Sequence, residues 1–116
     1  MKMLHVTIQT NRFDEELCFY QDIVGLQMIT DMRPMGRTMV FLADEKGDTE
    51  IEIIANPDAD NAGNQYLSVG FKTENVHEKR AELEEKGMEV SPMVCPAPNV
   101  EFFFVKDPAG ISVQFM

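Results

Sequence analysis

Hydrophobic and polar residues alternate along several short segments of the chain, and this pattern predicts β-strands. In residues 3–10, MLHVTIQT, every second residue is apolar, so one side of the strand is apolar and the other polar. Residues 11–25 instead place apolar side chains at helical spacing, and Gly25 supplies a stop signal. The first half is therefore predicted as β-α-β-β-β, with its later strands at residues 26–32, 37–44 and 49–55.

The same order of elements recurs after residues 56–64, a polar segment without periodicity that we predict as a linker. A second helix is expected over residues 74–87, and strands are expected at residues 66–73, 88–94, 100–107 and 111–116. Residues 91–100 hold three prolines and are predicted to form a stiff, irregular loop. We therefore expect one structural domain built from two modules, residues 1–55 and 65–116.

A helix covers only one face of each short sheet, so the other face must be covered by a second unit or line a cavity. The face expected under the helices is apolar: Leu4, Val6, Ile8, Ile51, Ile53, Leu67, Val69, Phe71, Ile111, Val113 and Phe115. The opposite face is mixed: His5, Thr7, Gln9, Glu50, Glu52, Tyr66, Ser68, Ser112 and Gln114. Aligning the repeats places Glu52 opposite Gln114 and His5 opposite Tyr66, which favours a shared pocket. A solvated sheet face would produce the same alternation.

Composition narrows the class of partner. The chain has 116 residues, 44% of them hydrophobic, which is enough for one well-formed core. Its formal charge of -10 disfavours nucleic acid and anionic membranes. The N-terminal segment lacks the apolar stretch of a signal peptide, and no run has membrane-spanning length, so a cytoplasmic location is expected. The two cysteines lack metal or disulfide spacing and are read as reduced thiols.

Two motifs point to a family. CFYQDIVGLQM after the first helix and FVKDPAGISVQFM at the C-terminus resemble the vicinal oxygen chelate superfamily, which includes glyoxalase I, bleomycin-resistance proteins, fosfomycin-resistance enzymes and extradiol dioxygenases. The resemblance implies an α+β fold of tandem β-α-β-β-β modules that form a cupped, half-open barrel. It also implies a homodimer, in which His5 and Glu52 of one chain face Tyr66 and Gln114 of the other.

Glyoxalase-like members hold a metal at four positions that correspond to His5, Glu52, Tyr66 and Gln114. The first two match a usual ligand type, whereas the family normally shows His and Glu at the last two. Tyr66 would have to lose its phenolic proton, and Gln114 offers only a neutral carbonyl. No cofactor is therefore expected. His5, Glu52 and Gln114 remain candidates for weak binding of Ni, Zn, Mn or Fe.

Three functions remain open. The first is a metal-independent binding protein for a small apolar or aromatic molecule, with or without an anionic group. The second is a glyoxalase-type lyase or isomerase, either metal-dependent or with Glu52 as general base, His5 beside it and Tyr66 as a hydrogen-bond donor. The third is a vestigial cavity with a structural or interaction role. The predicted ligand-binding residues are His5, Glu52, Tyr66, Gln114, Met39, Phe41, Phe102 and Phe104, with Arg33 and Arg37 as a clamp for an anion.

Overall fold

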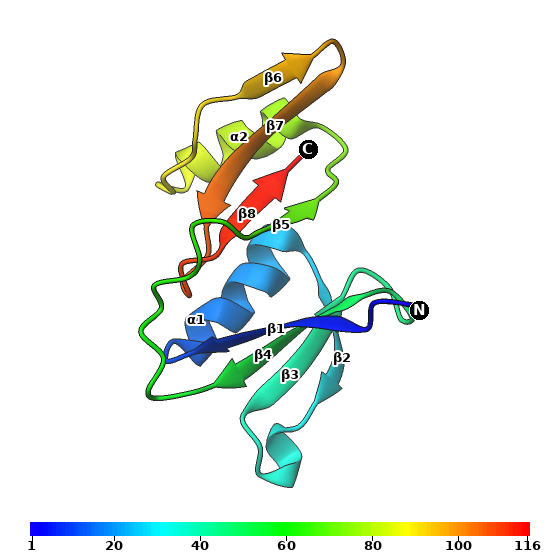
Figure 1. Ribbon diagram of the computed structural model, residues 1–116, viewed down its shortest axis with the longest axis vertical. Coiled ribbons are helices and arrows are strands. Elements are labelled where there is room, and N and C mark those ends of the chain that lie inside the picture. Colours follow the sequence, from blue (N-terminus) through cyan, green and yellow to red (C-terminus); the bar gives the residue numbers. More distant parts are fainter. The chain divides into compact units, whose positions relative to one another are not determined.

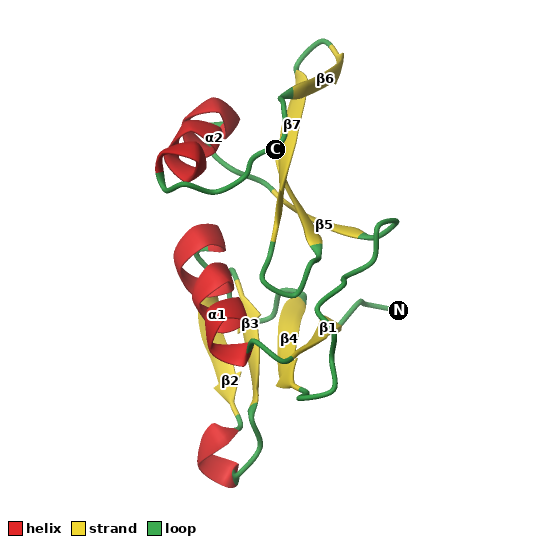
Figure 2. Cartoon of the chain, turned by 90° about the vertical axis from the view of Figure 1, so that its left-hand side faces the viewer, coloured by secondary structure: helices red, strands yellow, loops and turns green.

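A computed structural model describes all residues, 1–116. The chain divides into two compact units, Met1–Asn61 and Ala62–Met116, and the division falls inside the segment predicted as a linker. Each unit contains an open four-stranded sheet with helix on one face (Figures 1 and 2). The α+β class and the two β-α-β-β-β modules are confirmed.

The first unit follows the predicted order of elements. Its strands are β1 (His5–Thr10), β2 (Gln27–Asp31), β3 (Met39–Ala43) and β4 (Glu50–Ala55). They lie in the order β1-β4-β3-β2, with β1 parallel to β4 and the other pairs antiparallel. Helix α1 (Phe13–Cys18) continues as a π-helical segment (Phe19–Val24) that ends at Gly25, whose φ of 88° suits glycine.

The core of the first unit lies between α1 and the sheet. Ile8, Ile53 and Val40 are register partners across three strands, and all are buried. Leu17 of α1 and Tyr20 of the π-helical segment are also buried. Apolar burial on this face fixes which residues point to the opposite, open face.

The second unit repeats this plan. Strands β5 (Ser68–Phe71), β6 (Val94–Ala97), β7 (Val100–Lys106) and β8 (Ser112–Phe115) lie in the order β5-β8-β7-β6. Helix α2 (Val76–Glu85) is capped at its N-terminus by Asn75, whose side chain accepts a hydrogen bond from the Glu78 backbone N–H. The buried core residues are Leu83, Phe103, Val105, Val113 and Phe115.

The second strand of the second unit, β6, is displaced from its predicted place. Residues 88–93 are not a strand, and β6 instead lies inside the segment that was predicted as an irregular loop. Pro92 lacks the N–H that a ladder needs, whereas Pro96 is tolerated because β6 is an edge strand with an irregular register. The hairpin turns at Asn99, whose φ of 66° is left-handed.

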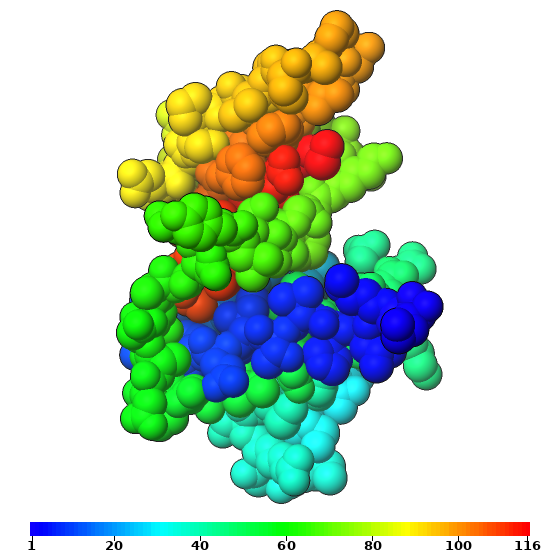
Figure 3. All heavy atoms as spheres, in the orientation of Figure 1, coloured from blue at the N-terminus to red at the C-terminus, as the bar shows by residue number.

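Two residues expected in the core are exposed. Leu4 is 69% and Leu67 51% exposed, because each precedes the first residue of its strand. The N-terminal segment that contains Leu4 lies at the surface in the space-filling view, in dark blue (Figure 3). The predicted apolar face therefore extended one residue too far toward the N-terminus in the first strand of each unit.

Candidate functional site: the open faces of the two sheets

A carboxylate lies in the middle of the open face of the first sheet. Glu52 of β4 is only 8% exposed, and its Oε1 accepts a hydrogen bond of 2.5 Å from the Thr7 hydroxyl. His5 Nε2 lies 3.7 Å from the same oxygen, and the His5 side chain is 40% exposed. The structure thus brings His5 and Glu52 together and adds Thr7, which sequence reasoning had not singled out.

Aromatic and thioether side chains flank this carboxylate. Phe41 of β3 is the register partner of Glu52, and its ring meets the His5 ring edge-on at 5.9 Å. Met39 lies two residues earlier on β3, on the same face of the strand, and is half-buried. These four predicted residues therefore share one face of the first unit.

The two arginines predicted as an anion clamp have different surroundings. Arg33 donates from Nε and Nη2 to the two Asp31 oxygens, at 2.9 Å and 2.7 Å, and its guanidinium lies 5.8 Å from the Phe13 ring centroid. These hydrogen bonds lower the pKa of Asp31 and raise that of Arg33. The charge of Arg33 is thus matched within the protein, whereas Arg37 is exposed and in no ion pair.

The open face of the second sheet carries an amide and two phenyl rings. Gln114 of β8 is the register partner of Gly70 on one side and of Phe104 on the other. A Cβ atom at Gly70 would lie 3.4 Å from Gln114 Oε1, so the amide lies beside bare backbone. The Phe102 and Phe104 rings pack edge to face with their centroids 5.7 Å apart. This face has no charged side chain at the position of Glu52.

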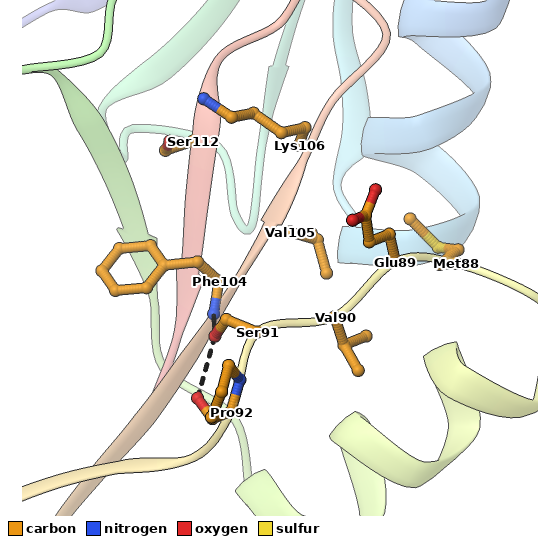
Figure 4. A pocket seen from close by; sticks show the side chains of 9 residues that line it. All are labelled: Met88, Glu89, Val90, Ser91, Pro92, Phe104, Val105, Lys106 and Ser112. Carbon is orange, nitrogen blue, oxygen red and sulfur yellow. Dashed lines mark hydrogen bonds between the residues drawn. The ribbon is translucent and has the colours of Figure 1, made fainter.

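Two hollows border Phe104. A cavity of about 640 Å³ is lined by residues of β7 and β8 and by residues 88–92, which lead from α2 to β6 (Figure 4). Its lining residues are Met88, Glu89, Val90, Ser91, Pro92, Phe104, Val105, Lys106 and Ser112. A smaller hollow of about 280 Å³ is lined by Gln65, Tyr66, Leu67, Ser68, Phe104 and Ser112. Phe104 and Ser112 are therefore common to both hollows.

Ser91 fixes the wall of the larger cavity. Its N–H donates to the Phe104 carbonyl at 2.9 Å, and its hydroxyl accepts from the Phe104 N–H at 2.8 Å. The Ser91 hydroxyl donates to the Pro92 carbonyl, and the Ser91 carbonyl accepts from Arg80 Nε, both at 2.9 Å. Residues 88–92 are thus tied to β7 and to α2 through one serine.

The strand registers revise the alignment of the two repeats. His5 is paired with Glu50, two residues before Glu52, and Ser68 is paired with Ser112, two residues before Gln114. Counted in this way, His5 corresponds to Ser68 rather than to Tyr66. Tyr66 precedes β5 and is 89% exposed.

The residues at the family's metal positions do not fit a divalent metal. The first unit offers one imidazole and one carboxylate. The second offers the Gln114 amide together with either the Ser68 hydroxyl, which the register gives, or the Tyr66 phenol, which the sequence alignment gives. Within each unit, no three His, Cys, Asp or Glu side chains are arranged to hold a metal ion. Because Zn²⁺ and similar ions require several imidazole or anionic ligands, no metal-dependent step follows from these side chains.

Sequence reasoning had not identified Ser91, Lys106 or Ser112 as lining a cavity. Lys106 and Ser112 are register partners at the ends of β7 and β8. Their alternation with buried residues places them on the open face, so the pattern itself contained this signal. Ser91 carried no such signal, because it lies outside any strand and its role depends on how the segment between α2 and β6 packs against β7.

The helices include none with the length and hydropathy required for a membrane span.

Among curated proteins, a lactoylglutathione lyase of Neisseria meningitidis serogroup A is 26% identical, with 100% of this chain and 90% of the relative covered. A lactoylglutathione lyase of Haemophilus influenzae is also 26% identical, over 100% of this chain and 92% of its own length.

Solved structures share the fold at low identity. The fosfomycin resistance protein FosX from Listeria monocytogenes has a TM-score of 0.79 at 14% identity, covering 99% of this chain and 91% of its own. TnmS3, an antibiotic binding protein from Streptomyces sp. CB03234, has a TM-score of 0.75 at 16% identity, covering 99% and 93%. A family model matches residues 2–115, and with the two repeated modules this shows that the chain belongs to the glyoxalase/bleomycin resistance protein/dioxygenase superfamily.

Proposed function

We propose that the chain binds a small apolar or aromatic molecule, without a metal, on the open face of its second unit. The position of Phe104 is the observation that carries this proposal, since its ring borders both hollows. The larger hollow, at about 640 Å³, has the size of a small-molecule site. Aromatic faces bind planar ligands through stacking and apolar contact.

The contrast in chemistry between the two open faces supports binding rather than catalysis. Phe102, Phe104 and Gln114 offer rings and a neutral amide, with no acid or base among them. These three side chains can contact a ligand but cannot themselves transfer a proton. TnmS3, whose solved structure shares the fold, is described as an antibiotic binding protein.

Isothermal titration calorimetry with a panel of planar aromatic acids, amides and hydrocarbons tests the proposal. Phe104→Ala should weaken binding of any hit about tenfold or more, because a phenyl ring contributes roughly 1.5–3 kcal/mol when it is buried. Phe104→Tyr keeps the ring and should retain binding. A hit whose affinity is unchanged in Phe104→Ala would place the ligand elsewhere and contradict the proposal.

A glyoxalase-type lyase or isomerase is the second candidate. It is favoured by the cluster of His5, Thr7 and Glu52 and by the lactoylglutathione lyases at 26% identity. In this alternative Glu52 acts as general base, with His5 beside it. An assay for lactoylglutathione lyase activity, without metal and with added Ni²⁺, Zn²⁺, Mn²⁺ or Fe²⁺, distinguishes it from the first. Turnover that is abolished by Glu52→Gln would favour the enzyme.

The predicted homodimer is part of the proposal, and sedimentation equilibrium measures it directly. A monomer at micromolar concentration would contradict it. If the binding and activity assays are both negative while the chain is dimeric, the third alternative, a vestigial cavity with an interaction role, is favoured.

A further inference from the structure

We infer that the ligand of the larger cavity is an aromatic anion, whose ring contacts Phe104 and whose negative group is held by Lys106 and Ser112. This inference rests on the proposed function, because it specifies the ligand class for the same cavity. It assigns the anion contact to the second unit, where sequence reasoning had placed it on Arg33 and Arg37.

The spacing of Phe104 and Lys106 suits such a ligand. They are two residues apart on β7, so their side chains point to the same face of the sheet, and their Cα atoms are about 6.5–7 Å apart. Ser112 is the register partner of Lys106 on β8. Figure 4 shows Lys106 extending from β7 toward the side on which Ser112 lies. A ligand ring that packs on Phe104 can therefore direct a substituent toward the Lys106 ammonium group.

Charge distinguishes Lys106 from the other lining residues. It is the only cation that lines either hollow, and it takes part in no ion pair within the protein. Glu89 is the one acid that lines the same cavity, and it belongs to the segment 88–92, across β7 from Ser112 (Figure 4). An anion is therefore attracted to the β7–β8 side of the cavity and repelled from the other wall.

The two serines of the cavity differ in what they can still donate. The Ser91 hydroxyl already accepts from the Phe104 N–H and donates to the Pro92 carbonyl. The Ser112 hydroxyl has no such bond within the protein and can donate to a ligand oxygen. An ammonium and a hydroxyl side by side form charge-assisted hydrogen bonds with a carboxylate or phosphate.

Matched ligands test the inference. Calorimetry compares 1-naphthoate with 1-naphthamide, which share ring and shape but differ in charge. The wild-type chain should bind the acid roughly tenfold more tightly than the amide. Lys106→Met, which keeps the apolar stem, should abolish this preference and leave the amide affinity within about twofold. Lys106→Arg should retain the preference.

Lys72→Met serves as the control for net charge, since Lys72 is exposed in the same unit but lines neither hollow. It should keep the preference for the acid. Equal affinity of the wild type for acid and amide, or a preference that survives Lys106→Met, would overturn the inference while leaving the proposed function in place. Failure of both compounds and of the whole aromatic panel to bind would overturn both.

Discussion

The open faces of the two units carry different chemistry on the same strand framework. Across the first sheet the register row is Thr7, Glu52 and Phe41; across the second it is Gly70, Gln114 and Phe104. The first row buries the Glu52 carboxylate and supplies the Thr7 hydroxyl that donates to it, whereas the second row has a neutral amide and a glycine at these positions. Where the charge is absent, the phenyl ring borders open cavities. The difference teaches that one framework can direct its polar groups inward to each other or leave an apolar surface for a ligand.

The largest expected effect is a loss of stability that differs between the cores of the two units. Phe115 and Phe103 stack with centroids 5.5 Å apart, where the first unit has Ile53 and Val40 at the equivalent register positions. Phe115→Ala should lower the free energy of unfolding by about 3–5 kcal/mol, because both the contact and the packing are lost. Urea denaturation measures the change. Ile53→Ala is the matched substitution, and a larger loss from it would show that the aromatic pair is not the main stabilising contact of the two.

The next effect concerns the buried carboxylate of the first unit. Thr7→Val keeps the shape of the side chain but removes the hydroxyl that donates to Glu52. Stability should fall by about 1.5–3 kcal/mol, since a buried charged acceptor loses its partner. Thr7→Ser should recover most of this loss. A double-mutant cycle with Glu52→Leu checks the cause, and additivity of the two substitutions would contradict the coupling.

A smaller effect on stability is expected at Ser91, which lies outside β6 and is hydrogen-bonded to Phe104 of β7. Thr30 of β2 pairs with Phe41 in the first sheet, whereas Ser91 holds Phe104 partly through its side chain. Ser91→Ala should cost about 1 kcal/mol and speed amide hydrogen exchange at Phe104, because the N–H loses its acceptor. Exchange measured by NMR gives the rate. Unchanged protection at Phe104 would mean that the backbone bond alone holds the segment.

The smallest expected effect is on the reaction rates of the two cysteine thiols, Cys18 in the first unit and Cys95 in the second. The hydrogen bond and negative charge of Asp22 raise the pKa of Cys18, and partial loss of hydration together with the charge of Glu101 raises the pKa of Cys95. A raised pKa lowers the thiolate fraction at pH 8, so both thiols should react with iodoacetamide more slowly than free cysteine.

Removing each carboxylate tests this cause. Asp22→Asn should speed alkylation of Cys18 alone, and Glu101→Gln should speed that of Cys95 alone, as resolved by mass spectrometry of the peptides. The rate should rise with pH in every variant, and the variant curves should lie at lower pH. Equal rates in variant and wild type would exclude the carboxylates as the cause.

Much of the fold could be predicted, because each sheet has a helix on one face and a different environment on the other. That asymmetry imposes alternation on β1, β4, β7 and β8, and it was visible in the sequence. Residues 88–97 escaped prediction, since prolines give no periodicity and the edge position of β6 depends on tertiary pairing. The π-helical segment Phe19–Val24 also carried no separate signal.

The candidate site was predictable only in part. His5 and Glu52 are adjacent because β1 and β4 are paired in parallel. The alignment of the two repeats already suggested that these two side chains share one face. The correspondence of His5 with Ser68 required the actual register, which differs from the sequence alignment by two residues. The charge of Arg33 suggests an anion clamp, but composition does not reveal that Asp31 already binds this guanidinium.

The attachment of residues 88–92 to the sheet at a single serine bears on how this chain can diversify. Insertions or deletions on either side of Ser91 would change the volume of the larger cavity beside β7 without altering the buried core residues of the second unit. Selectivity for differently sized molecules can therefore evolve through changes in loop length, at little risk to folding.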